Sequence, residues 1–293
     1  MNILKKVLNF GRKKETYGAK HETEVLFNIL THLVLIVTGI LFLMPILWML
    51  LTSLKSNQQL FGGVWLPDPP VWSNYIEAVK RISFARYTVN TIYISVLNVV
   101  GTVFSCVLPA YGFARLKWPG RNMLFLIVIG TMMLPFQVTM IPVYIIFRKL
   151  GWIGTYHPLT IPAFFGVPFF IFLLRQFFTG IPEDLSDAAR IDGASELGIL
   201  FRVILPLSKA AVLTVALFTF MWTWNDFLYP LIYLNDDTMY TLSLGLQQYR
   251  VSHAVDWGPL MAAASIIILP MIVLFFFTQK NFIEGITMTG IKG

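Results

Sequence analysis

Apolar residues occur along the chain in six long stretches that are separated by more polar segments. The stretches cover residues 27–52, 89–114, 122–147, 158–178, 210–234 and 258–278. A helix needs roughly 20 apolar residues to cross a bilayer hydrocarbon core of about 30 Å, and each stretch meets that length. Backbone groups in lipid must hydrogen-bond within the protein, and barrel strands alternate over only about 10 residues. The pattern therefore predicts an all-α integral membrane protein with six transmembrane helices.

Composition supports a membrane protein and narrows its chemistry. The chain is 56% hydrophobic and 13% charged, whereas soluble domains carry about 25% charged residues. Cys106 is the single cysteine, which excludes an intrachain disulfide framework and a thiolate metal cluster, so no metal site is expected. The net charge of +7 is not gathered into a basic patch interleaved with aromatic residues, so we expect no nucleic-acid partner.

Basic residues flanking the stretches predict the orientation. With a cytoplasmic N-terminus, fifteen Lys and Arg residues fall inside and seven outside, so both termini are expected in the cytoplasm. Residues 1–26 then form an N-terminal tail and residues 281–293 a C-terminal tail. The stretch 27–52 is too long for a signal-peptide core and has no cleavage site after it, which indicates a retained first span.

The loop after the first span is expected outside the cell. The first span and this loop together cover residues 27–85, and the loop is rich in Trp and Pro. Two interpretations stay open for the loop: a linker in the aromatic belt of the membrane interface, or a contact surface for a binding protein.

The cytoplasmic segment 180–209 has strong local signals for two helices. Pro182 suits the start of a helix, and Glu183 and Asp184 complement the positive end of its dipole. Gly193 provides a stop, and Ser195 is a favoured N-cap for a second helix. Leu197, Leu200, Phe201 and Ile204 have helical spacing and are expected on one face of that second helix, which would lie along the membrane. Glu183, Asp187 and Arg190 are expected to be free to project into the cytoplasm.

This segment carries a resemblance to a known family. Asp187-Ala188-Ala189, then Gly193, Val203 and Leu205-Pro206 resemble the "EAA" loop of bacterial ATP-binding-cassette importer permeases in every spacing. Asp187 stands where the family has Glu, and Val203 where it has Ile. The resemblance extends from about Arg86 to the C-terminus. Two further segments, Trp224-Asn225-Asp226-Phe227-Leu228 and Gly290-Ile291-Lys292-Gly293, are similar to the carbohydrate-uptake branch, in particular to the smaller permease of maltose-type transporters.

The resemblance implies a fold, a set of partners and a location. It implies a core transmembrane domain over residues 86–280 in a bacterial cell membrane, paired with a second permease, two ATPase subunits and an extracytoplasmic solute-binding protein that delivers a sugar or oligosaccharide. ATP and Mg would bind to the ATPase subunits, and no cofactor to this chain. The first helix of the loop would dock in a cleft of the ATPase. The expected coupling residues are Glu183, Asp187, Ala188, Ala189, Arg190, Asp192, Gly193, Leu205 and Pro206.

Asp226 is the one carboxylate well inside a predicted span, which makes it a candidate functional residue. Its polar and aromatic neighbours suit a sugar site, since aromatic faces contact C–H patches while carboxylate or amide oxygens accept hydroxyl hydrogen bonds. The expected substrate-pathway residues are Trp222, Trp224, Asn225, Asp226 and Tyr229. The alternative is that Asn225 and Asp226 satisfy purely structural hydrogen bonds.

Other function classes fit the sequence less well. An ion-coupled secondary transporter usually needs more ionisable residues at mid-membrane than this chain has. A membrane enzyme would need a metal-binding or nucleophilic constellation, and the paired Asp236-Asp237 instead resembles a surface turn. A P-loop requires Gly followed by Lys, which never occurs here, so ATP hydrolysis must come from another subunit. An importer permease for a different small polar solute stays an alternative.

Overall fold

The computed structural model describes the backbone of residues 2–251 and 254–290 and the side chains of residues 27–249 and 255–279. The chain separates into two compact units, residues 1–71 and 72–293. The helices and short strands have the following bounds: α1 Asn2–Ser53, α2 Asn57–Phe61, α3 Ser73–Arg81, α4 Phe84–Arg115, α5 Arg121–Gly130, η1 Thr131–Met133, α6 Phe136–Lys149, α7 His157–Thr160, η2 Ile161–Phe165, α8 Pro168–Gly180, α9 Glu183–Ile191, α10 Glu196–Ile199, η3 Leu200–Ile204, α11 Leu205–Leu207, α12 Lys209–Asn225, α13 Leu228–Tyr233, η4 Asp237–Met239, α14 Leu242–Gly245, η5 Leu246–Tyr249, β1 Arg250–Val251, β2 Ala254–Val255 and α15 Trp257–Gly290.

The first unit contains the long helix α1 and a short capped helix, α2. The span Phe27–Ser53 within α1 presents its apolar side chains outward, as expected for a surface in contact with lipid or another membrane helix. Ser56 and Gln59 form a reciprocal capping box at the start of α2. Lys55 is buried nearby, where its ammonium group donates to the Val64 carbonyl at 2.7 Å.

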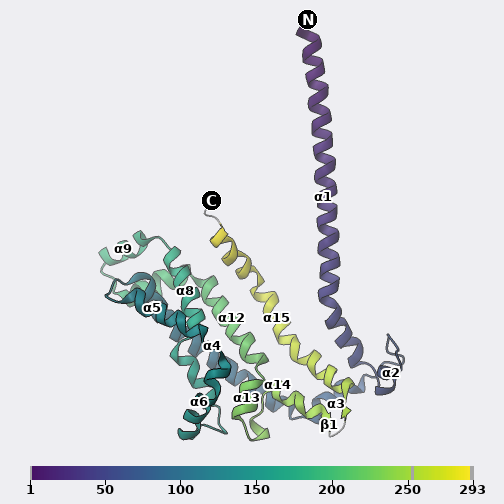
Figure 1. The fold of residues 1–293 in the computed structure, drawn as a ribbon, viewed down its shortest axis with the longest axis vertical. Helices are drawn as coiled ribbons and strands as arrows, with labels where there is room; N and C mark the ends of the chain where they lie inside the picture. Colours follow the sequence, from purple (N-terminus) through teal and green to yellow (C-terminus); the bar gives the residue numbers. More distant parts are fainter. Residues whose placement is uncertain (1, 252–253, 291–293) are drawn as a thin grey trace. The chain divides into compact units, whose positions relative to one another are not determined.

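The second unit is organised around α4, against which α8 and α12 pack (Figure 1). Val107 and Ala110 of α4 meet Leu174 of α8 and Val215 of α12 in one buried cluster, together with the fully buried Cys106. In Figure 1, α9 lies at one end of this unit and α13 and α14 lie at the other. An element on either end can therefore be mechanically connected to the other through α4.

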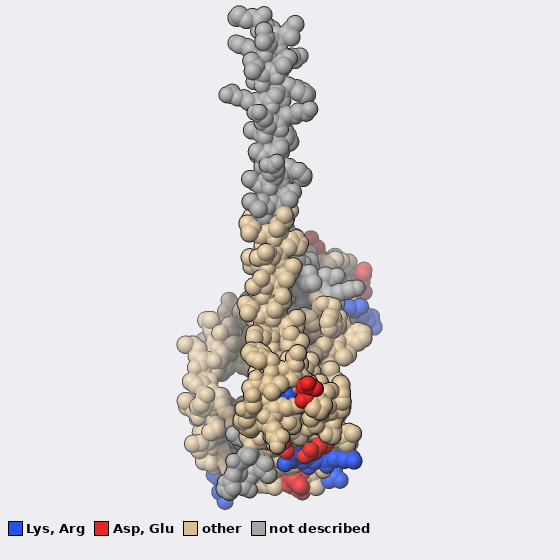
Figure 2. All heavy atoms as spheres, turned by 90° about the vertical axis from the view of Figure 1, so that its right-hand side faces the viewer, with Lys and Arg blue, Asp and Glu red and all other residues tan. Residues whose placement is uncertain are grey.

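The surface carries few charges, as a membrane protein requires. On the face drawn in Figure 2, Lys, Arg, Asp and Glu occupy small areas, and the rest of the described surface belongs to other residues. Exposed large apolar side chains occur along all the long helices of both units. Contiguous apolar surface of this extent is typical of contact with lipid or with another subunit.

Four helical segments of the described chain are long and apolar enough to cross a membrane by themselves. They are Phe27–Ser53, Phe84–Arg115, His157–Gly180 and Trp257–Gln279, and two bent pairs bring the total to six if each pair counts as one span. The two strands form only a two-residue antiparallel ladder. The prediction of an all-α polytopic membrane fold is confirmed.

Three predicted spans are not single straight helices, and one of them, 158–178, is interrupted at residues 166–167 between η2 and α8. The stretch 122–147 is divided into Arg121–Met133 and Phe136–Lys149, which are bent by 97°. Pro135 has no N–H to continue the helix, and a residue before proline is pushed out of the helical region, as Leu134 is here. The uniform hydrophobicity of this stretch gave no sign of so large an angle.

The stretch predicted as 210–234 is also broken. Helix α12 ends at Asn225, Asp226 adopts extended backbone, and the chain resumes as α13 at Leu228. At its other end α12 is bent by 81° from the segment Glu196–Leu207. That angle agrees with the prediction that the second helix of the loop lies across the direction of the following span.

Candidate functional site

Helix α9 forms where the sequence signals placed it. It spans Glu183–Ile191, follows Pro182 directly, and has Glu183 and Asp184 in its first turn. Acidic residues at this position stabilise the positive end of the helix dipole. The predicted first helix of the loop is therefore present.

Gly193 ends α9 in a Schellman motif. Its backbone is left-handed, with φ of 81°, and its N–H donates to the Arg190 carbonyl while the Ala194 N–H donates to Ala189. A Cβ at Gly193 would meet no atom within 4 Å, so the glycine is required by its conformation and not by lack of space. Ser195 then caps α10 by accepting from the Gly198 N–H at 3.2 Å.

The prediction that four apolar residues share one face of the second helix is wrong in part. Leu200 and Ile204 are fully buried, but Leu197 and Phe201 are 60% and 54% exposed. The segment Leu200–Ile204 is a π-helical turn, which widens the helix and shifts the residues after it relative to regular α spacing. This turn leads into Pro206, which occupies the first turn of α11.

The charged residues of the loop are not free, contrary to the expectation for Arg190 and Asp187. Arg190 Nη1 donates to Asp187 Oδ1 at 2.6 Å, and its Nε donates to Glu196 Oε1 at 2.8 Å. Glu196 also accepts from the Tyr111 hydroxyl at 2.5 Å. Glu183 is exposed and lies 3.7 Å from the Lys117 ammonium group. Asp187, Arg190 and Glu196 of the loop are therefore paired with one another before any partner binds.

The hydrogen bonds in this network shift two pKa values. The bond to Glu196, followed by the one to Asp187, raises the pKa of the Arg190 guanidinium. The bond from Arg190, followed by the one from Tyr111, lowers the pKa of the Glu196 carboxyl. Both groups are consequently charged throughout the physiological pH range.

The exposed side of α9 carries apolar as well as acidic residues and is uncovered in this chain. Ile191 is 86% exposed, and Leu185 and Ala188 are also exposed, whereas Ala189 packs inward against the core. Of the remaining predicted coupling residues, Asp192, Gly193 and Pro206 are exposed and Leu205 packs against the core. The predicted set thus contains both surface residues and residues that hold the loop to the protein.

A cavity of about 630 Å³ lies within the second unit, among residues of α4, α6, α8, α12 and α13. It is lined by residues of five chain regions: Ile94, Asn98, Thr102, Val143, Phe147, Pro158, Leu159, Pro162, Ala163, Gly166, Val167, Pro168, Phe170, Thr219, Trp222, Thr223, Asp226, Tyr229, Pro230, Tyr233 and Thr241. Two interruptions of helical backbone, at 166–167 and at 226–227, occur beside it. Non-helical backbone at membrane depth is tolerated where it lines a cavity or is buried in protein.

Polar side chains of α4 hold the interrupted segment 157–167 in place. Asn98 Nδ2 donates to the Leu159 carbonyl at 2.7 Å, and Ser105 Oγ donates to the Ala163 carbonyl at 2.8 Å. The Val167 N–H donates to Cys106 Sγ at 3.2 Å. These bonds satisfy backbone groups that a continuous helix would have satisfied internally.

The structure divides the five predicted substrate-pathway residues. Trp222, Asp226 and Tyr229 line the cavity. Trp224 is buried elsewhere and donates through its indole N–H to the Ile267 carbonyl at 3.1 Å. Asn225 is not part of the lining, and its amide donates to the Met221 carbonyl of its own helix at 2.8 Å. Successive positions around α12 point in different directions, which the sequence run alone did not separate.

Asp226 has a structural bond as well as a place in the cavity wall. Its Oδ1 accepts from the Tyr229 N–H at 3.2 Å at the start of α13. A carboxylate in this position satisfies a free backbone donor of the short helix.

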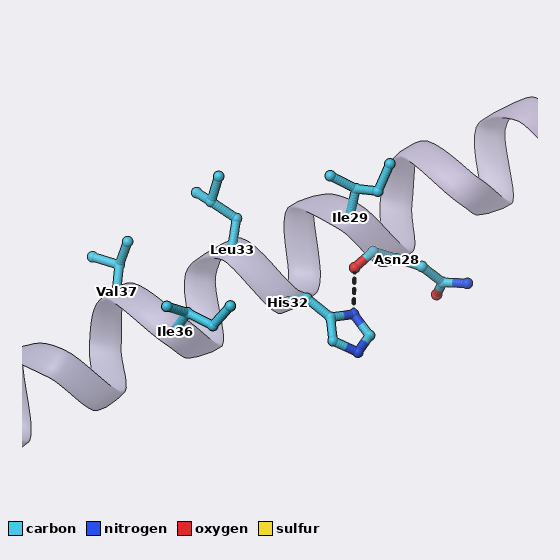
Figure 3. A pocket seen from close by; sticks show the side chains of 6 residues that line it. All are labelled: Asn28, Ile29, His32, Leu33, Ile36 and Val37. Carbon is cyan, nitrogen blue, oxygen red and sulfur yellow. Dashed lines mark hydrogen bonds between the residues drawn. The ribbon is translucent and has the colours of Figure 1, made fainter.

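A second hollow, of about 760 Å³, lies along α1 and is lined by Asn28, Ile29, His32, Leu33, Ile36 and Val37 (Figure 3). All six side chains come from one helix, and His32 Nδ1 is bonded to the Asn28 carbonyl of the same helix at 2.7 Å. A single helix provides no opposing wall, so we assign no solute site to this hollow.

Sequence reasoning missed the residues that connect the loop to the transmembrane helices. Tyr111, Arg115 and Glu196 lie in segments up to 85 positions apart, and no local pattern pairs them. The acidic Glu196 directly after the N-cap Ser195 was readable only as a helix-start signal. Asn98 and Thr102 in the cavity wall were likewise hidden in an otherwise apolar stretch.

An apolar polytopic helical fold with a charged loop hairpin and a partly open cavity is typical of a membrane transport component. Residues 101–287 match the family described as "Binding-protein-dependent transport system inner membrane component", and the chain belongs to this family. Its members include permease subunits of ABC importers. The chain is accordingly an integral inner-membrane transport component and not itself an ATPase.

Two relatives and one solved structure are similar over most of their length. The "Arabinooligosaccharides transport system permease protein AraQ" of Bacillus subtilis is 35% identical over 272 residues, covering 91% of this chain and 96% of the relative. The "Trehalose/maltose transport system permease protein MalG" of Thermococcus litoralis is 31% identical over 275 residues, covering 92% and 99%. A chain in the crystal structure of a bacterial ABC transporter involved in the import of the acidic polysaccharide alginate is 26% identical, with a TM-score of 0.79 and coverage of 89% and 98%.

Proposed function

We propose that this chain forms part of the pathway for a sugar or short oligosaccharide and that ATPase subunits drive it by contact with α9. The observation that carries the proposal is the exposed outer side of α9, held between a proline start and a left-handed glycine stop. An ABC importer permease works with ATPase subunits, a second permease and a binding protein. The proposal assigns α9 to the contact with the ATPase subunits and the cavity to the solute.

The chemistry of α9 suits a docking element. Ile191 and Leu185 offer apolar surface for burial, and Ala188 allows close approach by a partner backbone. Asp187 and Glu183 add negative charge at the rim. Asp187 already forms an ion pair with Arg190, and Glu183 lies near Lys117. Interfaces of this kind draw most of their affinity from a few buried apolar anchors inside a polar rim.

The cavity suits a polyhydroxylated solute. Trp222 and Tyr229 present aromatic faces, while Asp226, Asn98 and Thr223 supply polar groups on the same walls. Sugars are recognised by this combination of aromatic stacking and hydrogen bonding. The names of the two relatives and of the alginate transporter support a carbohydrate over another small polar solute.

The proposed orientation places α9 and both termini in the cytoplasm, following the excess of Lys and Arg on that side. Cysteine substitution at Ile191 and at Asp237, followed by labelling with a membrane-impermeant maleimide in intact cells, tests this orientation. We expect Asp237→Cys to be labelled and Ile191→Cys to react only after the cells are opened. The reverse result would place the loop outside and exclude docking to an ATPase.

The docking role is tested with Asp187→Lys and Gly193→Trp in the complete complex. Both variants should insert into the membrane, because neither residue lies in a span, yet transport should be uncoupled from ATP hydrolysis. Gly180→Ala is the matched control, since it precedes α9, has open space for a Cβ and has no left-handed backbone. Normal uptake by both variants would refute the docking role.

The solute class is tested by uptake into proteoliposomes of labelled arabinotriose, maltose and trehalose, with glycine betaine as a non-carbohydrate probe. The binding protein, both permeases and the ATPase subunits are included. ATP-dependent accumulation of at least one of the sugars, and not of glycine betaine, is the expected result. Accumulation of glycine betaine alone would favour the alternative of a different small polar solute.

A further inference from the structure

A chain of hydrogen bonds runs from α9 to the last turns of α4. Arg190 of α9 is bonded to Glu196, the first residue of α10, and Glu196 accepts from the Tyr111 hydroxyl on α4. The Tyr111 side chain is 4% exposed and belongs to the same buried cluster as Leu174 and Ile199. A buried residue of a transmembrane helix therefore bonds directly to the charged network of the loop.

The bonds in this chain are short and involve charged groups. The Tyr111 hydroxyl lies 2.5 Å from Glu196 Oε2, and Arg190 Nε lies 2.8 Å from Glu196 Oε1. Hydrogen bonds to ionised groups are roughly twice as strong as neutral ones. Glu196 is thus held from both sides, by the loop through Arg190 and by α4 through Tyr111.

The other end of α9 is attached to the same helix. Arg115, the last residue of α4, is buried, and its Nη2 donates to the Ile181 carbonyl at 2.6 Å. Ile181 directly precedes Pro182 and the start of α9. Helix α9 is accordingly joined to α4 both before its first turn and, through Glu196, after its last turn.

Helix α4 continues from these contacts to the cavity. It is one helix of 32 residues, about 48 Å long, and it stays helical through Pro109. Asn98 and Thr102 on this helix line the cavity, and Asn98 donates to the carbonyl of Leu159, a neighbouring residue of the cavity wall. Displacement of the α9 end of α4 would therefore move the cavity wall.

We propose that Tyr111 and Glu196 are positioning residues that fasten α9 to α4, so that a displacement of α9 is passed to the cavity through α4. The inference rests on the proposed contact between α9 and the ATPase. It goes beyond that contact because it names α4 as the helix that receives the motion of α9. Two sites are coupled when they bias the same packed element, and α4 is in contact with both.

The experiment measures a nucleotide-dependent change in the cavity and needs no solute. Thr223→Cys places a reporter in the cavity wall, while the native Cys106 is fully buried and contributes little background. The full complex is labelled with N-ethylmaleimide with and without AMP-PNP and Mg²⁺. The variants Tyr111→Phe and Glu196→Gln are compared in this background, with Tyr240→Phe as control, since Tyr240 packs against Tyr87 of α4 at the end far from the loop.

We expect the labelling rate of the parent and of Tyr240→Phe to change with AMP-PNP. In Tyr111→Phe and Glu196→Gln the AMP-PNP-dependent change should shrink about fivefold or more, with the ATPase subunits still bound. The double variant should lose no more than the more affected single variant, because both changes break one connection. Tyr111→Phe keeps the buried ring, so the fold is preserved.

Two results would overturn the inference. One is an undiminished AMP-PNP response in either single variant, and the other is loss of the ATPase subunits from both, which would show a role in holding the loop together and not in passing on its motion. A parent complex without any AMP-PNP response, or without bound ATPase, would instead contradict the proposed function. The two failures are therefore distinguishable.

Discussion

The loop at 180–209 and the cavity wall are built in different ways. In the loop, hydrogen bonds join residues that are close in sequence. Arg190 bonds to Asp187 and Glu196, and the Gly193 N–H donates to the Arg190 carbonyl at the end of α9. In the cavity wall, polar groups of α4 satisfy backbone groups more than 50 positions away, as Asn98 does for Leu159. The loop is therefore a compact charged hairpin with an exposed apolar side, whereas the cavity exists only when distant segments meet.

Because they are built differently, the two regions suit different kinds of partner. A preformed hairpin that exposes Ile191 can bind another protein without rearranging its own charges. A cavity bounded by interrupted helices offers polar groups and aromatic faces to a small solute. Substitutions that affect one region without the other test this separation.

The largest expected effect is on the loop. Ile191→Glu places a charge on the exposed apolar side of α9, and burial of an unpaired charge at an interface is strongly unfavourable. We expect retention of the ATPase subunits to weaken by about 2 kcal/mol or more, roughly 30-fold. Phe61→Glu, an equally exposed position in the first unit, is the control. Co-purification of the ATPase with each variant is the measurement, and unchanged retention with Ile191→Glu would remove α9 from the interface.

The next effect is on the cavity. Asp226→Ala removes a carboxylate from the wall and an acceptor from the start of α13. We expect uptake to fall about tenfold, because a hydrogen bond to a charged group is worth about 1.5–3 kcal/mol, with the ATPase retained. Asp226→Asn keeps the acceptor for the Tyr229 N–H and separates the two roles. Full uptake by Asp226→Asn, together with full uptake by Asp226→Ala, would remove Asp226 from the solute pathway.

These two regions were not equally readable from the sequence. Pro182, Gly193 and Ser195 act within a few residues of themselves, so the sequence was sufficient to place α9, its stop and the next helix. The π-helical turn at Leu200–Ile204 and the bond of Arg190 to Glu196 depend on folding of the whole hairpin and were not anticipated.

The cavity was only partly predictable for a physical reason. Asp226 was found because a carboxylate inside an apolar stretch is rare. Trp224 and Asn225 were grouped with it by proximity in sequence, but they point away from the cavity. Thr102 and Asn98 were missed because a polar residue in an apolar run has no partner until the opposing segment is placed. The six-span helical class followed from hydrophobicity alone, whereas the 97° bend at Pro135 required the fold.

A smaller effect separates two neighbouring tryptophans. Trp224→Phe removes the indole donor to the buried Ile267 carbonyl, which costs about 1–3 kcal/mol. We expect it to lower the thermal unfolding temperature of the purified permease and to leave the half-saturation concentration for uptake unchanged. Trp222→Phe, in the cavity wall, should alter uptake with little change in stability. The same pattern from both variants would contradict the division of these residues.

The smallest expected effect is on the pH dependence of the loop. Because the pKa of Glu196 is lowered by Arg190 and Tyr111, the stabilisation is fully present above the ordinary Glu value of about 4.3 and is lost as pH falls through the lowered value. Thermal unfolding should therefore show the full stabilisation from this group, without pH dependence, between about pH 6 and 8. Comparison of Glu196→Gln with the parent from pH 3 to 7 checks the sign, since the stability difference should shrink only at the acidic end.

The central claim is that α9 is the surface gripped by the ATPase, and photo-crosslinking tests it most directly. Ala188→Cys, on the exposed side of α9, and Asp237→Cys, in the turn η4, are each modified with benzophenone maleimide in the assembled complex and irradiated. We predict a covalent product between the permease and an ATPase subunit from Ala188→Cys and none from Asp237→Cys. An ATPase product from Asp237→Cys and none from Ala188→Cys would contradict the account.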